Sequence, residues 1–143
     1  MSIDFNKPLT LNFRLIEFLT TSPMRGGHDR VCRDLEKLPK PQQDEIIKNP
    51  TQLAVLIQRE VRPRFGNKPI IINSGWRGVQ LNKEIGGASR SQHLFGRAAD
   101  IVVVGVGFKQ VQRTLDPIWP GGLGYGHGFT HLDIRPQRAR FNY

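Results

Sequence analysis

The sequence predicts an α+β fold in which helices flank a small, mostly antiparallel sheet. Helical patterns come first along the chain, and short apolar runs rich in β-branched residues follow, interleaved with short helical segments. The 143 residues include 15 glycines and 10 prolines, which place turns between these elements. Hydrophobic residues make up 38% and charged residues 23%, a composition that is typical of a globular domain and excludes a disordered or fibrous chain.

Helical signals dominate the first part of the chain. Residues 11–19 carry apolar side chains near helical spacing and predict a short helix. Residues 21–45 are polar and contain several prolines, so we expect a surface excursion with one helical turn. Pro50 suits the first position of a helix that continues to Val61 and that Pro63 ends.

Strand and helix signals alternate in the second part. Short runs of Ile and Val favour strands that are buried, and glycine or proline follows each helical pattern. The elements expected in order are a buried strand at 69–73, a turn at 74–78, a helix at 79–85, a buried strand at 98–104, a helix at 108–115, a glycine-rich loop at 121–127 and a strand at 129–134.

We expect a single domain with three parts. These are a helical N-terminal part at 1–66, a core at 67–135 that contains the strands, and a basic tail at 136–143. The tail predicts either a solvated terminus or a contact with an anionic surface. Residues 1–5 do not form a basic segment followed by an apolar one, so we expect no signal peptide.

The chain is strongly basic, with a net charge of +9 at pH 7 and a pI near 10.5. Such a charge indicates a polyanionic partner, and nucleic acid, an anionic membrane face and an anionic cell wall all fit. The longest apolar run, residues 101–104, is far below the roughly 20 residues that a membrane span needs. Aromatic residues make up only 8% and are not interleaved with the basic ones, which disfavours a nucleic-acid-binding module.

Three potential metal ligands stand in order in the second part: His93, Asp100 and His131. Catalytic zinc takes three nitrogen or oxygen ligands from the protein and leaves a fourth position for water. Gly96 lets the chain turn tightly between His93 and the strand near Asp100. The single cysteine, Cys32, cannot supply a thiolate cluster. The pattern therefore predicts a zinc site built from two imidazoles and one carboxylate.

Two residues are candidates for the general base. Asp133 lies two positions after His131 on a strand, so both side chains face the same way. Asp133 either accepts the proton or orients His131 through a hydrogen bond. His127, in the glycine-rich loop, is the second candidate. His28 lies outside this pattern, and we expect it to be an exposed surface residue.

Four sequence strings together resemble the zinc D-Ala-D-Ala carboxypeptidase family. That family includes phage L-alanyl-D-glutamate endopeptidases and shares a fold with the hedgehog signalling domain. The resemblance spans about residues 69–135, close to half the chain. It rests on Ser-Gly-Trp-Arg-Gly at 74–78, Leu81-Asn82 with Gly86-Gly87, Ser91-Gln92-His93-x-x-Gly96-x-Ala98-x-Asp100, and Gly124-Tyr125 with Phe129-x-His131-x-Asp133.

The resemblance implies a hedgehog-like, DD-peptidase-like fold and roles for individual residues. It implies that His93, Asp100 and His131 bind Zn²⁺, and that Arg77 contacts the substrate carbonyl oxygen and stabilises the developing oxyanion. Ser91 either hydrogen-bonds near the substrate or braces the loop. Many relatives carry a catalytic carboxylate three residues before the last zinc histidine, where this chain has Gly128, so the base must come from elsewhere.

The expected function is a zinc-dependent peptidoglycan peptidase, either an endopeptidase or a D,D- or L,D-carboxypeptidase. We expect a phage cell-wall lysin that is made in the host cytoplasm and acts after release, or one carried in a virion. The alternative is a catalytically inactive, zinc-stabilised wall-binding or structural module. As partners we expect a peptidoglycan peptide and the anionic wall, with no specific nucleic acid, no membrane and a monomeric chain.

Overall fold

The computed structural model describes residues 3–19 and 27–143. It combines helices with a five-stranded sheet in the order β1-β2-β4-β3-β5, which confirms the α+β class. The helices are η1 (Leu15–Phe18), α1 (Gly27–Glu36), α2 (Lys40–Glu60), η3 (Arg62–Phe65), α3 (Val79–Glu84), η4 (Gln92–Phe95) and α4 (Phe108–Leu115). The strands are β1 (Ile70–Ser74), β2 (Ala98–Val103), β3 (Gly122–Tyr125), β4 (Thr130–Asp133) and β5 (Ala139–Asn142).

The sheet is mixed, which corrects the expectation of a mostly antiparallel sheet. The β1–β2, β2–β4 and β4–β3 pairs are antiparallel, and β5 runs parallel to β3. Both β3 and β5 come from segments expected to be a loop and a tail. The guanidinium of Arg140 stabilises β5, because it donates to the backbone carbonyls of Asp116, Trp119 and Gly121. The pattern of apolar residues in the sequence cannot predict such contacts between an arginine and backbone carbonyls.

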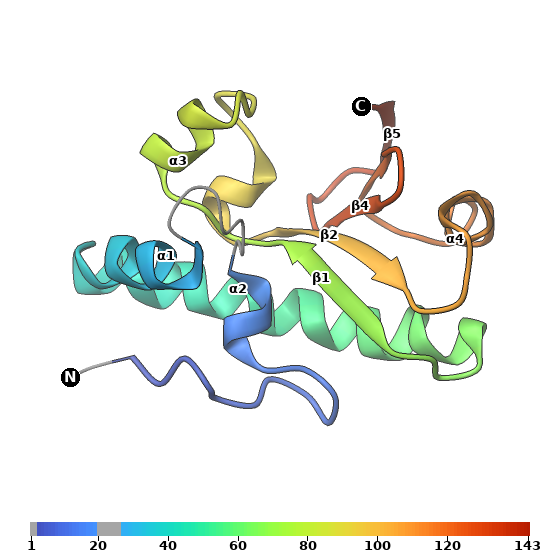
Figure 1. The fold of residues 1–143 in the computed structure, drawn as a ribbon, viewed down its shortest axis with the longest axis horizontal. Helices are drawn as coiled ribbons and strands as arrows, with labels where there is room; N and C mark the ends of the chain where they lie inside the picture. The colour runs from blue at the N-terminus through green and yellow to red at the C-terminus, as the bar shows by residue number, and fades with distance from the viewer. Residues whose placement is uncertain (1–2, 20–26) are drawn as a thin grey trace.

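The long helix α2 begins ten residues before the expected start at Pro50. Pro50 lies inside the helix, although proline removes one backbone hydrogen bond and disfavours a helix interior. Apolar residues after Pro50, namely Leu53, Ala54 and Ile57, are fully buried. Burial of each of the two larger side chains, Leu53 and Ile57, stabilises the fold by about 1.5–3 kcal/mol. This is enough to offset the hydrogen bond that Pro50 cannot form. Figure 1 shows α2 running along one side of β1 and β2.

The expected excursion at 21–45 is wrong for its described part. Residues 27–36 form α1 and residues 40–45 belong to α2, whereas 21–26 lie outside the described residues. The amphipathic face of α1 is narrow, with Val31 and Leu35 fully buried in a small cluster that also contains Trp76 and Leu81. Few apolar positions therefore mark this helix in the sequence.

The main hydrophobic core lies between α2, α4 and the sheet. It joins side chains of α2 and α4 to residues of β2 and β4, among them Ile57, Leu115, Ile101 and Leu132. Strand β1 is buried on one face only, since Ile71 is 51% exposed between buried neighbours. Among the described helices, none has both the length and the apolar composition needed to cross a membrane.

Candidate metal centre

His93, Asp100 and His131 converge at one point, each from a different element. His93 comes from η4, Asp100 from β2 and His131 from β4. Their ligating atoms all lie within 4.8 Å of one another. The antiparallel β2–β4 register places Asp100 directly opposite His131, which explains why residues 31 positions apart meet.

The turn around η4 holds the His93 ring in one orientation. His93 Nδ1 lies 2.8 Å from the carbonyl oxygen of Gly75, to which it donates as the Nδ1–H tautomer. The backbone N–H of His93 donates to the Ser91 hydroxyl, which caps η4. Gly96 ends the turn with a left-handed φ of 71°. Ser91 thus braces this loop, one of the two roles expected for it.

The position of Gly75 depends on close contact with the N-terminal segment. A Cβ on Gly75 would lie 2.0 Å from the carbonyl oxygen of Phe18, so no side chain fits there. The backbone N–H of Trp76 donates to the same carbonyl over 2.7 Å. The contact with Phe18 therefore fixes the backbone at Gly75, whose carbonyl oxygen bonds to the ring of His93.

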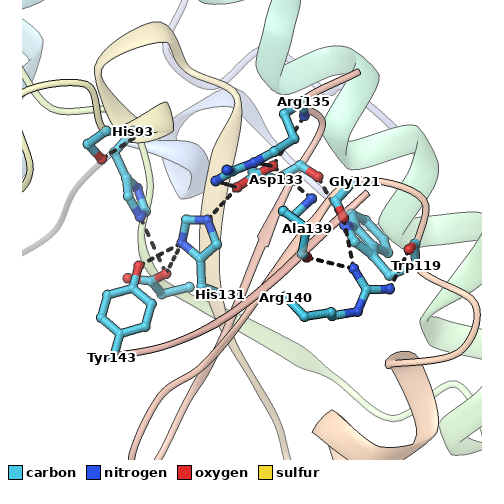
Figure 2. A network of polar contacts seen from close by, with 12 residues as sticks. His93, Trp119, Gly121, His131, Asp133, Arg135, Ala139, Arg140 and Tyr143 are labelled. Atoms are coloured by element: carbon cyan, nitrogen blue, oxygen red, sulfur yellow. Dashed lines mark hydrogen bonds and ion pairs between the residues drawn. The ribbon is translucent and has the colours of Figure 1, made fainter. Parts of the chain in front are cut away.

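His131 is held by a chain of charged groups. His131 Nε2 lies 2.7 Å from Oδ2 of Asp133, whose side chain is fully buried. The backbone N–H of Gly122 donates to Asp133 Oδ1, and the Arg135 guanidinium donates to both carboxylate oxygens. Figure 2 shows the His131 ring between Asp133 and Tyr143. Every oxygen of Asp133 therefore has a partner within the protein.

The charges of the three converging residues suit a divalent cation. Burial opposes ionisation of Asp100, but the nearby His131 and His93 rings outweigh it and lower the pKa of the carboxyl to about 2. Burial lowers the pKa of His93 and favours the neutral imidazole. Burial also disfavours the charged form of His131, yet its bonds to Asp100 and Asp133 raise its pKa overall.

The His93 ring leaves one buried nitrogen for a ligand. Nε2 lies 3.3 Å from Asp100 Oδ1 but forms no hydrogen bond of proper geometry with any described residue. A buried polar atom without a partner is unfavourable unless something binds it. Two imidazole nitrogens and a carboxylate form the donor set that catalytic zinc prefers. The residues therefore fit zinc.

Arg77 lies beside the three ligands and is 8% exposed. Its guanidinium donates to the amide oxygen of Asn82 over 2.9 Å and to the hydroxyl of Ser74 over 3.2 Å. Both of these partners are neutral. Burial lowers the pKa of Arg77, but a guanidinium stays charged in proteins. Arg77 therefore keeps a positive charge and has donors to offer a ligand.

A pocket of about 680 Å³ opens onto His131 and Arg77. None of the described residues that line it is acidic. Arg90, Arg135 and Arg140 line it together with Ser91 and Tyr143. Arg135 and Arg140 pair with aspartates, whereas Arg90 has no ion pair with any described residue. The pocket is thus suited to an anionic ligand.

His127, the second candidate for the base, lies elsewhere. Its side chain is exposed, and its ring packs edge-on against Phe108 with 5.3 Å between the centroids. The side chain of His28 lies outside the described part of the chain. The structure therefore brings together His93, Asp100, His131, Asp133, Arg77 and Ser91, and places His127 away from them.

Two residues at this site were missed in the sequence. Arg135 donates to Asp133, and its place two residues after that aspartate, just past the end of β4, was an available signal. Tyr143 places its hydroxyl 2.8 Å from His131 Nδ1. Its signal is weak, because an aromatic residue after a basic run does not by itself indicate a strand.

Comparisons with known proteins agree with this geometry. The profile of the family described as Peptidase M15 matches residues 30–133. A segment covering 50% of this chain is 36% identical to the zinc D-Ala-D-Ala carboxypeptidase of Streptomyces albus G, over 25% of that protein. Likewise, 50% of this chain is 31% identical to the peptidoglycan L,D-endopeptidase MepK of Escherichia coli K12, over 43% of that protein. The chain thus spans less than half the length of these relatives, but the profile covers most of it: the chain belongs to the Peptidase M15 family.

Proposed function

We propose that this protein is a zinc-dependent peptidase that hydrolyses an amide bond in the stem peptides of peptidoglycan. The convergence of His93, Asp100 and His131 beside a buried, positively charged Arg77 carries the proposal. The names of the two relatives support it, since one is a zinc carboxypeptidase and the other a peptidoglycan endopeptidase.

Each residue of the site has a role that follows from its contacts. Zinc held by the two histidines and Asp100 would supply an activated water molecule and an electrophile for the carbonyl. The Arg77 guanidinium donates to the oxygen of the scissile carbonyl and stabilises the charge that develops there. Asp133 accepts a hydrogen bond from His131 Nε2–H, so that Nδ1 would be the nitrogen left to hold zinc.

Asp133 is therefore a positioning residue in this proposal. Its side chain is fully buried, and both oxygens accept hydrogen bonds from Arg135 or the backbone. A general base needs an oxygen within reach of the proton that it removes. The two carboxylate oxygens of Asp133 are already engaged, which favours orientation of His131 over proton transfer.

The charge of the pocket supports an anionic peptide as substrate. Stem peptides carry free carboxylates, and the pocket presents Arg77 and Arg90, while none of its described lining residues is acidic. The net charge of +9 supports attraction to an anionic wall as well. We extend the proposal to a phage lysin that acts on the wall after release or from a virion, without specific nucleic-acid or membrane partners and as a monomer.

The decisive experiment is mass analysis of peptidoglycan digests. Purified protein is incubated with wall fragments after loading with zinc, after chelation, and as the His93→Ala variant. We expect peptide release only from the zinc-loaded protein, and the new ends of the fragments will identify the bond. No release by the zinc-loaded protein would contradict the peptidase proposal.

One observation favours a second candidate, a zinc-stabilised module without turnover. Gly128 occupies the position where many relatives have a carboxylate, and the Asp133 carboxylate is engaged within the protein. In that case zinc would raise the thermal stability and the protein would sediment with walls, while no fragment would appear. The digest and the sedimentation assay therefore separate the two candidates.

A further inference from the structure

The side-chain amide of Asn82 joins Arg77 to the wall of the pocket, and Asn82 is only 2% exposed. Its oxygen Oδ1 accepts a hydrogen bond from Arg77 Nε over 2.9 Å. Its nitrogen Nδ2 donates to the carbonyl oxygen of Ala88, which lines the pocket, also over 2.9 Å. A guanidinium can only donate and a carbonyl can only accept, so these two partners allow one orientation of the amide.

The backbone on both sides of Asn82 holds this amide in place. The N–H of Asn82 donates to the carbonyl oxygen of Gly78 over 3.0 Å, and its own carbonyl accepts from the N–H of Gly87 over 2.8 Å. Gly87 packs so closely that a Cβ there would lie 2.1 Å from Asn82 Oδ1 and 3.1 Å from Arg77 Nη2. A side chain at residue 87 would therefore push the amide away from the guanidinium.

The side chains that hold the Arg77 guanidinium are neutral. Nε donates to the amide of Asn82, and Nη1 donates to the hydroxyl of Ser74. A carboxylate in either place would form an ion pair and offset the charge of the guanidinium. An amide fixes the orientation of the guanidinium without offsetting its charge, which stays available to a ligand in the pocket.

We propose that Asn82 is a positioning residue for Arg77, an inference that rests on the function proposed above. Asn82 does not line the pocket, so it acts through the arginine. Its amide fixes the direction in which the guanidinium donates to the scissile carbonyl, and it ties that guanidinium to residues 87–88 of the pocket wall. Stabilisation of an oxyanion depends on donors that are fixed before the reaction begins.

The Asn82→Ala variant removes both side-chain hydrogen bonds. Hydrolysis of stem peptides by the zinc-loaded protein gives kcat and KM, and competition with a chelating dye gives the zinc affinity. We expect kcat to fall about 100-fold, because misplacing a catalytic group by about 1 Å can have an effect of this size. KM and zinc affinity should change less than about twofold, because Asn82 acts on the transition state and is not a candidate ligand.

A double-mutant cycle shows whether the effect passes through Arg77. Arg77→Ala alone should lower kcat about 10²- to 10³-fold. Adding Asn82→Ala to that variant should change kcat less than about twofold, because the amide then has no guanidinium to position. Additive losses in the double variant would overturn the proposal, and so would an unchanged kcat in Asn82→Ala.

Gln112→Ala is the matched control for Asn82→Ala. Gln112 is another buried side-chain amide, and it donates to two backbone carbonyls of the connection between β3 and β4. We expect this variant to lower the thermal stability and to keep the kcat of the natural protein. A kcat loss as large as that of Asn82→Ala would show a general effect of losing a buried amide and would overturn the proposal.

Gly87→Ala displaces the amide without deleting it, because the new Cβ would meet Asn82 Oδ1. We expect kcat to fall about tenfold or more, again through a misplaced guanidinium. Its control is Gly107→Ala, where a Cβ meets nothing within 4 Å. An unchanged kcat in Gly87→Ala would show that the guanidinium does not need the amide in this place.

Solvent exchange of the Arg77 Nε–H, followed by NMR, separates this proposal from the function on which it rests. The proton is bonded to Asn82, so we expect exchange to be about tenfold faster in Asn82→Ala. If the natural protein releases no peptide but exchange becomes faster, the proposed function fails and Asn82 still positions the guanidinium. Unchanged exchange would overturn the positioning role, whether or not peptide is released.

Discussion

The turn that carries His93 and the strand that carries His131 bring their imidazoles to one point by different means. His93 is held by neutral hydrogen bonds to a backbone carbonyl and a serine cap. His131 is held by a carboxylate, which is held in turn by the Arg135 guanidinium. One ligand is therefore positioned by the close fit of the backbone and the other by charge.

This difference determines which parts of the molecule affect the position of each imidazole. The support of His93 extends through Gly75 to Phe18 in the N-terminal segment, so the helical part and the site share a contact. The support of His131 stays close by, at Gly122 in β3 and at Arg135 just after β4. Substitutions that break one support at a time can measure the contribution of each.

Removal of a candidate zinc ligand should have the largest effect. The loss of zinc affinity and of activity should be the same whether the ligand comes from the turn of His93 or from the sheet. We expect His93→Ala and Asp100→Ala to lower zinc affinity on the order of 10³-fold or more and to abolish peptide release. Metal content after dialysis and the wall digest measure these losses. The control is Asp44→Ala, which removes an exposed carboxylate paired with Lys40. Full activity in either ligand variant would refute the ligand assignment.

The charged support is tested by Asp133→Asn. We expect zinc affinity to fall about 10- to 100-fold, because the amide holds His131 less firmly. The free energy of unfolding should fall by about 3 kcal/mol, since the Arg135 guanidinium loses its buried partner. A chelator competition and urea unfolding measure these changes.

Arg138→Gln is the control for the charged support, because its exposed pair with Asp116 contributes at most about 1 kcal/mol. Unchanged zinc affinity in Asp133→Asn, combined with slow turnover, would instead show that Asp133 acts as the general base.

The close-fitting support is tested by Gly75→Ala. The new Cβ would lie 2.0 Å from the Phe18 carbonyl oxygen, so the two segments must separate. We expect a loss of about 2 kcal/mol in the free energy of unfolding and a zinc affinity about tenfold weaker. In the control, Gly107→Ala, a Cβ meets nothing within 4 Å. Equal losses in the two variants would show that the contact with Phe18 does not position His93.

The smallest effect is expected from Ser91→Ala, which removes the cap of η4. The free energy of unfolding should fall by about 1 kcal/mol, because the N–H of His93 loses its acceptor. Ser91→Thr keeps a hydroxyl and should behave like the natural protein. A higher KM with unchanged stability would instead place the Ser91 hydroxyl on the substrate.

Local signals in the sequence were sufficient for the elements that carry the three ligands. The strand around Asp100 is rich in apolar residues, and apolar residues at 129, 132 and 134 mark the strand around His131. Gly96 marks the turn that separates His93 from the first of these strands. The spacing of the ligands follows from this local order. The convergence of Asp100 and His131 follows from the antiparallel register of β2 and β4, which pairs these two residues.

The remaining parts depend on partners that are distant in the chain. Strand β5 forms because Arg140 and the rings of Phe141 and Tyr143 find places against β3 and the turn after α4. Pro50 stays inside α2 because the buried residues after it outweigh its local preference. Neither outcome can be predicted from the residues nearby, which favour a basic tail and a helix start.

The register between β2 and β4 also places the candidate metal site at the junction of two parts of the sheet. One part of the sheet, β1 with β2, contributes Asp100, and the unit of β4, β3 and β5 contributes His131. The turn of His93 comes directly before β2 in the chain. A cation shared by these residues would cross-link the two units, as a disulfide does between segments. Its binding free energy would add to the stability of the folded sheet, so loss of the metal would loosen the fold where the three residues meet.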